Sequence, residues 1–289
     1  MNYISWEISL AALVPAFILC LYIYVKDRAD KEPIHMLAAL FGVGFLAYIP
    51  SLLCEKFLLG TVDNIFADAM SFGLSGTVEF SSVGVEISHK LLCSFAGISI
   101  PEELFKWLPL FLLTFKSRHF NCIFDGIVYS SFVSLGFGSA ENLRYAWIDG
   151  WDTLLLRAVT SVPAHLFFGI FMGFCYTVWQ AYSKTAVKEL EYFNNGQINI
   201  RKFRHSGLWL SASIFLPILV HGIYSFVGAF SSVTMQILFY IFIALLYLAC
   251  FIIVHRISLK DGVTDKLADN WIVKAHPGLV KEDGGVENA

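Results

Sequence analysis

Seven stretches of about 20 or more mostly apolar residues constrain the fold of this chain more than any other feature, because a membrane-spanning α-helix needs roughly this length. They cover residues 4–25, 36–54, 87–115, 123–145, 154–179, 208–230 and 235–254. Only 15% of the 289 residues are charged and 57% are hydrophobic, whereas about a quarter are charged in a soluble domain. The sequence therefore predicts an all-α integral membrane protein, a bundle of about seven transmembrane helices.

The lysine and arginine residues indicate how these helices are oriented. Of the 20 basic residues, 15 lie in the connections after the first, third, fifth and seventh stretches, and only Lys56, Lys90 and Arg144 lie on the opposite side. Cytoplasmic connections carry the excess of such residues, so we expect the N-terminus outside and the C-terminus in the cytoplasm. The expected layout is a polytopic domain over 1–255, with an external surface loop at 55–89 and a cytoplasmic loop at 182–206. A cytoplasmic tail over 256–289, flexible at its end, follows.

The third stretch carries ionisable residues at its centre, in the segment I-S-I-P-E-E-L-F-K-W at 98–107. Charged residues inside a membrane span are costly and mark functional sites. Pro101 suits the first turn of a helix, so we expect a kinked helix or two half-helices here. Glu102 and Glu103 then occupy a first turn, where the helix dipole favours negative charge. Lys106 can pair with either glutamate but cannot neutralise both, so one carboxylate is left over.

Three further stretches contribute polar residues at depths from the middle of the membrane to its outer side. The fourth contains F-G-S-A-E-N, the fifth an arginine and a histidine, and the sixth a histidine. We expect these residues to converge with the glutamates of the third stretch on one polar centre: Glu102, Glu103, Lys106, Phe137, Glu141, Asn142, Arg157, His165 and His221. Small residues at G-x-G and G-x-x-x-G spacing in the fourth and fifth stretches would let the helices pack closely there.

Each of these residues also has an ordinary structural interpretation. A single histidine in a span is more often a hydrogen-bonded packing residue, and Arg157 is expected to pair with Glu141 or Asp152. Asp125, near the cytoplasmic end of the fourth stretch, suits a helix terminus better than a catalytic role. Taken together, however, three carboxylates and two histidines on four stretches favour a functional site.

Such a set supports hydrolysis of an acyl bond by two routes. A buried carboxylate beside a second one can act as general base on water, and histidines can position that water or stabilise an oxyanion. Glutamate and histidine are also zinc ligands; in that version Glu102 or Glu103, His165 and His221 hold the metal. Ligands scattered over separate helices favour the metal-free version. The sequence contains no H-E-x-x-H and no G-x-S-x-G motif, which leaves zincin and serine chemistries unsupported.

The ordered motifs resemble the PrsW family of intramembrane proteases, which are distant relatives of the CAAX prenyl endopeptidases. They are P-E-E-L-F-K, F-D-G-I-V-Y-S-S-F-V-S-L-G-F-G-S-A-E-N, R-A-V-T-S-V-P-A-H-L-F-F-G and H-G-I-Y. In that family the E-E-x-x-K, F-x-x-x-E and two histidine motifs are taken to form the active site, which implies this role for the matching residues Glu102, Glu103, Lys106, Phe137, Glu141, His165 and His221. The D-G-x-x-Y element falls on Asp125, Gly126 and Tyr129. Two departures are Ser130, where glycine is commoner, and Ser225, where Asn or Asp is usual.

The resemblance implies cleavage of a single-span membrane protein, such as an anti-sigma factor, on its external side in the cell membrane. We therefore expect Glu102 or Glu103 as general base and the other as its electrostatic partner, with both histidines positioning water or stabilising an oxyanion. Glu141 is expected to orient a histidine or to contribute to the base. The expected partners are the substrate and the lipid bilayer, with no nucleic acid, and a divalent metal such as zinc is the one cofactor considered. The alternatives are a proton-coupled transporter, against which no inverted repeat is found, and an inactive relative that binds membrane proteins.

Overall fold

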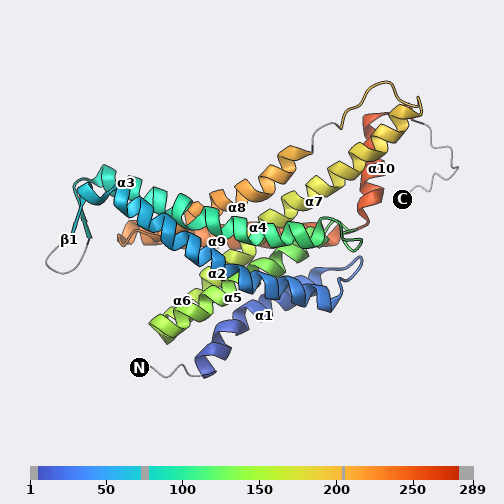
Figure 1. The fold of residues 1–289 in the computed structure, drawn as a ribbon. Helices are drawn as coiled ribbons and strands as arrows, with labels where there is room; N and C mark the ends of the chain where they lie inside the picture. The colour runs from blue at the N-terminus through green and yellow to red at the C-terminus, as the bar shows by residue number, and fades with distance from the viewer. Residues whose placement is uncertain (1–5, 73–77, 204–205, 280–289) are drawn as a thin grey trace.

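The computed structural model describes residues 6–72, 78–203 and 206–279, and this part of the chain is almost entirely helical (Figure 1). Its elements are α1 (Trp6–Lys26), α2 (Ile34–Ile65), η1 (Ala67–Ala69), β1 (Met70–Phe72), β2 (Val78–Phe80), α3 (Val83–Leu92), η2 (Cys93–Ser99), α4 (Ile100–Thr114), α5 (Asp125–Asp149), α6 (Trp151–Val159), α7 (Ser161–Asn194), α8 (Gly207–Gly228), α9 (Val233–Leu259) and α10 (Thr264–Ala275). The two strands form one antiparallel hairpin. This hairpin lies at one end of the molecule and α10 at the other (Figure 1).

Six helical stretches in the described part of the chain are long and apolar enough to cross a membrane: Trp6–Lys26, Ile34–Ile65, Val83–Thr114, Trp151–Asn194, Gly207–Gly228 and Val233–Leu259. The expected all-α, multi-pass membrane fold is confirmed. The fourth apolar stretch forms α5, which is not among the six, because small and polar residues such as Ser130, Ser134 and Asn142 dilute its hydropathy. These side chains are buried, as suits a helix at the centre of a bundle. The number of spans and their orientation stay predictions.

The long third stretch is one helical run rather than two separate half-helices. It passes from α3 through the π-helical segment η2 into α4, and Pro101 lies in the first turn of α4. A proline has no N–H to give to the preceding turn, and a wide π turn is a common way for a helix to accommodate such a break. The run therefore continues past Pro101 and carries Glu102 and Glu103 into the interior.

The connection at 55–89 is not the plain surface loop that we expected. Its first part continues α2 as far as Ile65, and its last part belongs to α3, so only the hairpin and its neighbours lie between the two helices. The apolar residues Phe57, Leu58 and Leu59 extend the helical sequence past position 54, and this extension keeps α2 alongside η2. At the other end of the bundle, α7 continues to Asn194 and the chain turns at Gly196 (φ +71°), so the first half of the expected 182–206 loop is helical. The end of the tail, 280–289, lies outside the described residues, so its expected flexibility is not tested.

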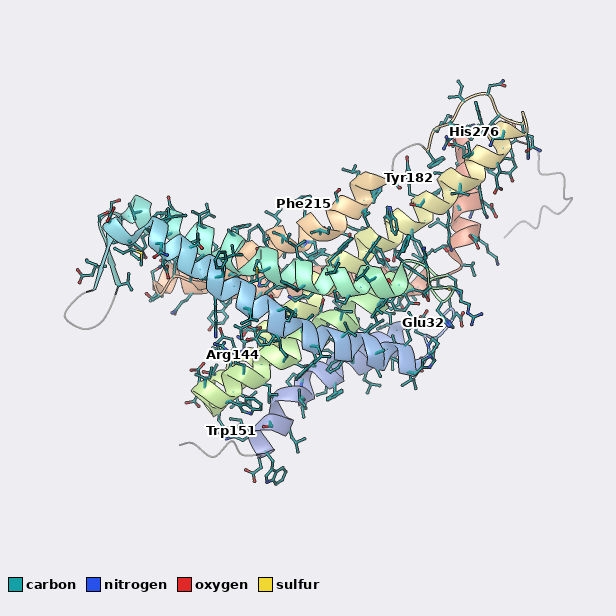
Figure 2. The ribbon with its side chains drawn as sticks, viewed as in Figure 1. Glu32, Arg144, Trp151, Tyr182, Phe215 and His276 are labelled. Atoms are coloured by element: carbon teal, nitrogen blue, oxygen red, sulfur yellow. The ribbon has the colours of Figure 1, made fainter. Side chains whose placement is uncertain are left out.

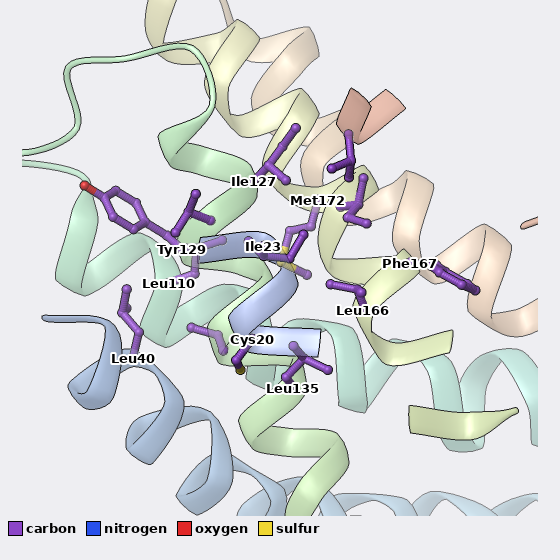
Figure 3. Close-up of a cluster of buried hydrophobic side chains, with 14 of the residues drawn as sticks. Cys20, Ile23, Leu40, Leu110, Ile127, Tyr129, Leu135, Leu166, Phe167 and Met172 are labelled. Carbon is purple, nitrogen blue, oxygen red and sulfur yellow. The ribbon is translucent and has the colours of Figure 1, made fainter. Parts of the chain in front are cut away.

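Helix α5 lies at the centre of the bundle because its small residues allow neighbouring backbones to approach. A Cβ on Gly173 of α7 would lie 2.2 Å from the backbone oxygen of Gly126, and a Cβ on Gly136 would lie 2.1 Å from that of Phe41 in α2. Both distances exclude a larger residue without displacement of a helix. An apolar cluster that includes Leu135 of α5 and Met172 of α7 surrounds these crossings (Figure 3).

Candidate active site

The first two turns of α4 place a lysine beside two glutamates in the protein interior. Lys106 Nζ lies 3.2 Å from Glu102 Oε2 and 2.7 Å from Glu103 Oε1. It also lies 3.0 Å from Nδ1 of His165, on α7. An ammonium group has three protons to donate, and these three acceptors use all of them. The fully buried Lys106 is therefore the centre of the polar network.

Two histidines attach α7 and α8 to this centre. Nδ1 of His221, on α8, lies 2.8 Å from Glu103 Oε1, and Nε2 of His165 lies 2.7 Å from Glu141 Oε2, on α5. A carboxylate only accepts hydrogen bonds, so the network assigns the proton of His221 to Nδ1 and that of His165 to Nε2. His221 then keeps a lone pair on Nε2, whereas both nitrogens of His165 are engaged.

Glu141 connects the network to the N-terminal helix through α6. Arg157 forms the expected ion pair with Glu141, with 2.7 Å between its terminal nitrogen and Oε2, and its Nε donates to Asn142 Oδ1 at 3.3 Å. Asn142 Nδ2 in turn donates to the backbone oxygen of Ala12 in α1 at 2.8 Å. Asn142 therefore positions the Arg157 side chain, and within the described part of the chain its own side chain forms no hydrogen bond with the glutamates or histidines of the polar network itself.

Aromatic rings enclose the charged atoms. Lys106 Nζ lies 4.4 Å from the ring centroid of Phe137, and the His221 ring stacks on Phe168 at 4.4 Å between centroids. A cation against an aromatic face is stabilised electrostatically. The small residue Gly138 gives His165 its space, since a Cβ there would lie 2.7 Å from its Cδ2.

The charges of this centre do not cancel. Three carboxylates, of Glu102, Glu103 and Glu141, face the two cations Lys106 and Arg157. With both histidines neutral, one negative charge remains uncompensated in a buried position, which is costly. A proton on one of the carboxylates or a bound cation would compensate this negative charge.

A cavity of about 510 Å³ opens beside the centre. It is lined by Glu102, both histidines and Glu141, but not by Glu103 or Lys106. Apolar side chains such as Leu52 and Ile98 form other parts of its wall. Of the two adjacent glutamates, Glu102 is thus the one that faces the space where a substrate and water would lie.

The donor set of this centre fits a divalent metal ion. One ligand atom from each of Glu102, Glu103 and His221 lies within 4.8 Å of the other two, and carboxylate oxygen and imidazole nitrogen are zinc ligands. Oε2 of Glu103 is buried and has no hydrogen-bond partner in the described part of the structure. His165, the other expected ligand, is not in this group, although its Nδ1 lies 3.9 Å from Glu102 Oε2; its two nitrogens contact Lys106 and Glu141.

Nine of the ten candidate residues meet in this network, and Asp125 does not. Its Oδ2 accepts from the backbone N–H groups of Asn121 (2.8 Å) and Cys122 (2.6 Å), so it fixes the start of α5. Sixteen residues of helix, roughly 24 Å, separate it from Glu141. In this structure Asp125 has the contacts of a helix-terminus residue.

Several polar residues that line the cavity were not predicted from the sequence. Glu55 of α2 adds a further carboxylate, and Tyr224 of α8 lies next to His221. We had assigned Glu55 to an external loop, and the apolar residues that follow it were the available signal that α2 continues. Tyr224 follows His221 by three residues, which is one helical turn.

A multi-pass helical bundle that encloses carboxylates, histidines and a lysine beside a cavity fits a membrane-embedded hydrolase. The model of the PrsW family of intramembrane metalloproteases matches residues 32–254, and the chain belongs to this family. It is thus an intramembrane protease and a multi-pass integral protein of the cell membrane.

Curated relatives agree with this assignment. Protease PrsW of Oceanobacillus iheyensis is 31% identical over 226 residues, which cover 78% of this chain and 85% of that protein. Protease PrsW of Bacillus subtilis is 29% identical over 217 residues, 75% of this chain and 80% of the relative. No solved structure shows a significant match.

Proposed function

We propose that this protease hydrolyses a peptide bond of a single-span membrane protein, such as an anti-sigma factor, near its extracytoplasmic side, with a water molecule activated by Glu102. The observation that supports it best is the convergence of Glu102, Glu103, Glu141, His165 and His221 from four helices beside one cavity. The cavity is also lined by residues near the ends of α5 and α8, Arg144 and Ala229, on the side that is predicted to be extracytoplasmic.

In this mechanism the cavity-facing carboxylate of Glu102 takes a proton from water as the water oxygen attacks the carbonyl carbon. The tetrahedral intermediate collapses, the C–N bond breaks, and Glu102 returns the proton to the departing amine. The nitrogen lone pair that His221 keeps on Nε2 can accept a hydrogen bond from the same water. Arg157, which lines the cavity, is the cation that we assign to the developing oxyanion.

The remaining residues hold these groups in position. Glu103 fixes the His221 ring through Nδ1 and accepts from Lys106, and Glu141 holds His165. Ligand rings held by a carboxylate on their second nitrogen keep one tautomer and one orientation. We therefore assign Glu103, Lys106, Glu141 and His165 to positioning roles.

The family description favours a metal, and Glu102, Glu103 and His221 are the residues that would hold it. A divalent ion such as zinc would lower the pKa of water and polarise the scissile carbonyl. Metal content of the purified protein, with activity measured before and after treatment with a chelator, distinguishes the metal-dependent from the metal-free version.

The test of the function is cleavage of a co-expressed single-span protein in the same membrane. Wild type should release a fragment, and E102Q, E103Q and H165A should each abolish or strongly reduce it. H119Q, at an exposed position outside the helices, is the matched control and should cleave normally. Cleavage at the wild-type rate in all three variants would exclude this site, and a wild type that binds the protein without cutting it would indicate an inactive relative.

A further inference from the structure

A second group of metal-ligand side chains lies at the hairpin end of the molecule. Nε2 of His89, in α3, lies 2.8 Å from Oδ1 of Asp63, in α2. The sulfur of Cys93, the first residue of η2, lies 3.7 Å from the same nitrogen. One ligand atom from each of the three residues lies within 4.8 Å of the other two. We call this group the hairpin-end cluster.

We propose that the hairpin-end cluster binds a zinc-type transition metal ion. Cysteine sulfur, histidine nitrogen and aspartate oxygen are the three kinds of protein ligand that zinc prefers. Two such ligands on one tetrahedral ion lie roughly 3.3–3.7 Å apart. The Cys93 sulfur lies 3.7 Å from Nε2 and 3.8 Å from Nδ1 of His89. To share an ion on Nε2, the sulfur must therefore turn toward that nitrogen, and the Asp63–His89 pair must open by about half an ångström.

Neighbouring aromatic rings hold the His89 side chain in place, whereas the Asp63 side chain is accessible to solvent. The His89 ring contacts two other rings, Phe66 at 5.3 Å and Phe80 at 5.2 Å between centroids. The side chain of Asp63 is 56% exposed, so water can supply a fourth ligand. The neighbouring cation, Lys90, is paired with Glu86 at 2.7 Å and does not occupy the aspartate.

An ion bound in the hairpin-end cluster would connect two helical segments that line the active-site cavity. Asp63 belongs to α2, whereas His89 and Cys93 belong to the helical run that continues into Glu102. Both of these helical segments line the active-site cavity, α2 through Leu52 and Leu59 and η2 through Ile98. A bound ion would join the two walls near their ends and stabilise one width of the cavity between them.

Cobalt is the probe that separates this site from the catalytic centre. A cobalt–thiolate bond has a charge-transfer absorption in the near ultraviolet, and no cysteine belongs to the catalytic donor set. The purified, reduced full-length protein titrated with Co²⁺ should therefore develop this band, and the band should reach a plateau as Co²⁺ is added. Zn²⁺ should displace it.

Matched variants complete the test. C93S should abolish the band, H89Q should abolish it or weaken Co²⁺ binding at least tenfold, and both should lose any rise in Tm that Zn²⁺ gives the wild type. C54S, which removes a partly buried cysteine of α2, and H221N in the catalytic centre should both keep the band. Absence of the band in the wild type, or its persistence in C93S, would overturn the proposal. Metal-free unfolding temperatures of the variants distinguish loss of a ligand from loss of the fold.

Discussion

Lys106 Nζ lies 3.0 Å from Nδ1 of His165, although α4 and α7 are distant in the sequence. This contact joins the glutamate pair to the Glu141–Arg157 pair, so the two halves of the catalytic centre form one network. Because the ammonium group is fully buried, its three hydrogen bonds have no competition from water. The network therefore depends on a charge that serves three acceptors at once.

Removal of that charge should destabilise the protein. K106M keeps the length of the side chain but leaves Glu102 and Glu103 without a cation, and breaking a buried ion pair in this way costs about 3–5 kcal/mol. We expect a large decrease in the unfolding temperature in detergent, together with loss of cleavage. K116M, in a turn outside the centre, is the control.

A double variant distinguishes the loss of the Lys106 charge from the loss of its packing as the cause of the destabilisation. If the cost of K106M comes from uncompensated carboxylates, K106M/E103Q should be more stable than K106M alone, since the second change removes one of those charges. A K106M variant with wild-type stability would show that the ion pairs do not form in the membrane.

Glu141 should control the rate of cleavage without taking part in the bond-breaking step. E141Q keeps an acceptor for His165 Nε2 but removes the charge that pairs with Arg157. Loss of such a supporting carboxylate commonly lowers activity about 10–100-fold. Initial rates of substrate cleavage should show this decrease, whereas D152N, at an exposed position in α6, should retain the wild-type rate. Equal rates for E141Q and wild type would remove Glu141 from the mechanism.

Gly138 should be required for the position of His165. A Cβ at Gly138 would lie 2.7 Å from His165 Cδ2, so G138A should displace the imidazole from its contacts and strongly reduce cleavage. G42A is the matched control, because a Cβ at Gly42 meets no atom within 4 Å. In both variants helix propensity favours alanine by about 1 kcal/mol. The comparison of their cleavage rates thus isolates the steric effect, and equal rates would contradict the geometry of the site.

The sequence predicted the fold class because a membrane requires long apolar segments, and length and composition are visible in the sequence. It did not predict where α2 ends, since that helix continues past the length that a bilayer needs. The apolar residues after position 54 indicate that the helix continues, but the sequence does not show its packing against η2, where a Cβ on Gly97 would lie 2.5 Å from Leu59 Cδ2. That contact is tertiary and involves residues far apart in the sequence.

The candidate site was predictable as a set of residues but not as a network. Intramembrane carboxylates and histidines are unusual enough to be recognised individually. Which of them meet depends on how α4, α5, α7 and α8 pack together, and the packing of α4 determines that Glu102 faces the cavity and Glu103 does not. The same limitation explains Glu55, which enters the cavity only because α2 extends beside η2.

A group of buried carboxylates in the connections at the α10 end of the bundle should make stability depend on pH. Asp27 and Glu32 are 0% and 4% exposed, and Glu32 lies in the short connection before α2 (Figure 2). Burial raises the pKa of Asp27 to about 6 and that of Glu32 to about 7, and the neighbouring carboxylate of Asp30 adds to both increases. The unfolded chain has ordinary values near about 4.

The folded state therefore binds more protons than the unfolded state between about pH 4 and pH 7. Its stability should be greatest below this window and should fall as the pH rises through it. E32Q removes one of the groups that must ionise, so it should unfold at a higher temperature than wild type at about pH 8 and show a smaller change between about pH 5 and pH 8. Thermal unfolding of the purified protein in detergent measures both quantities. E191Q, which changes an exposed glutamate of α7, should follow the wild-type curve, and an E32Q curve with the wild-type slope would show that Glu32 is already ionised in the folded protein.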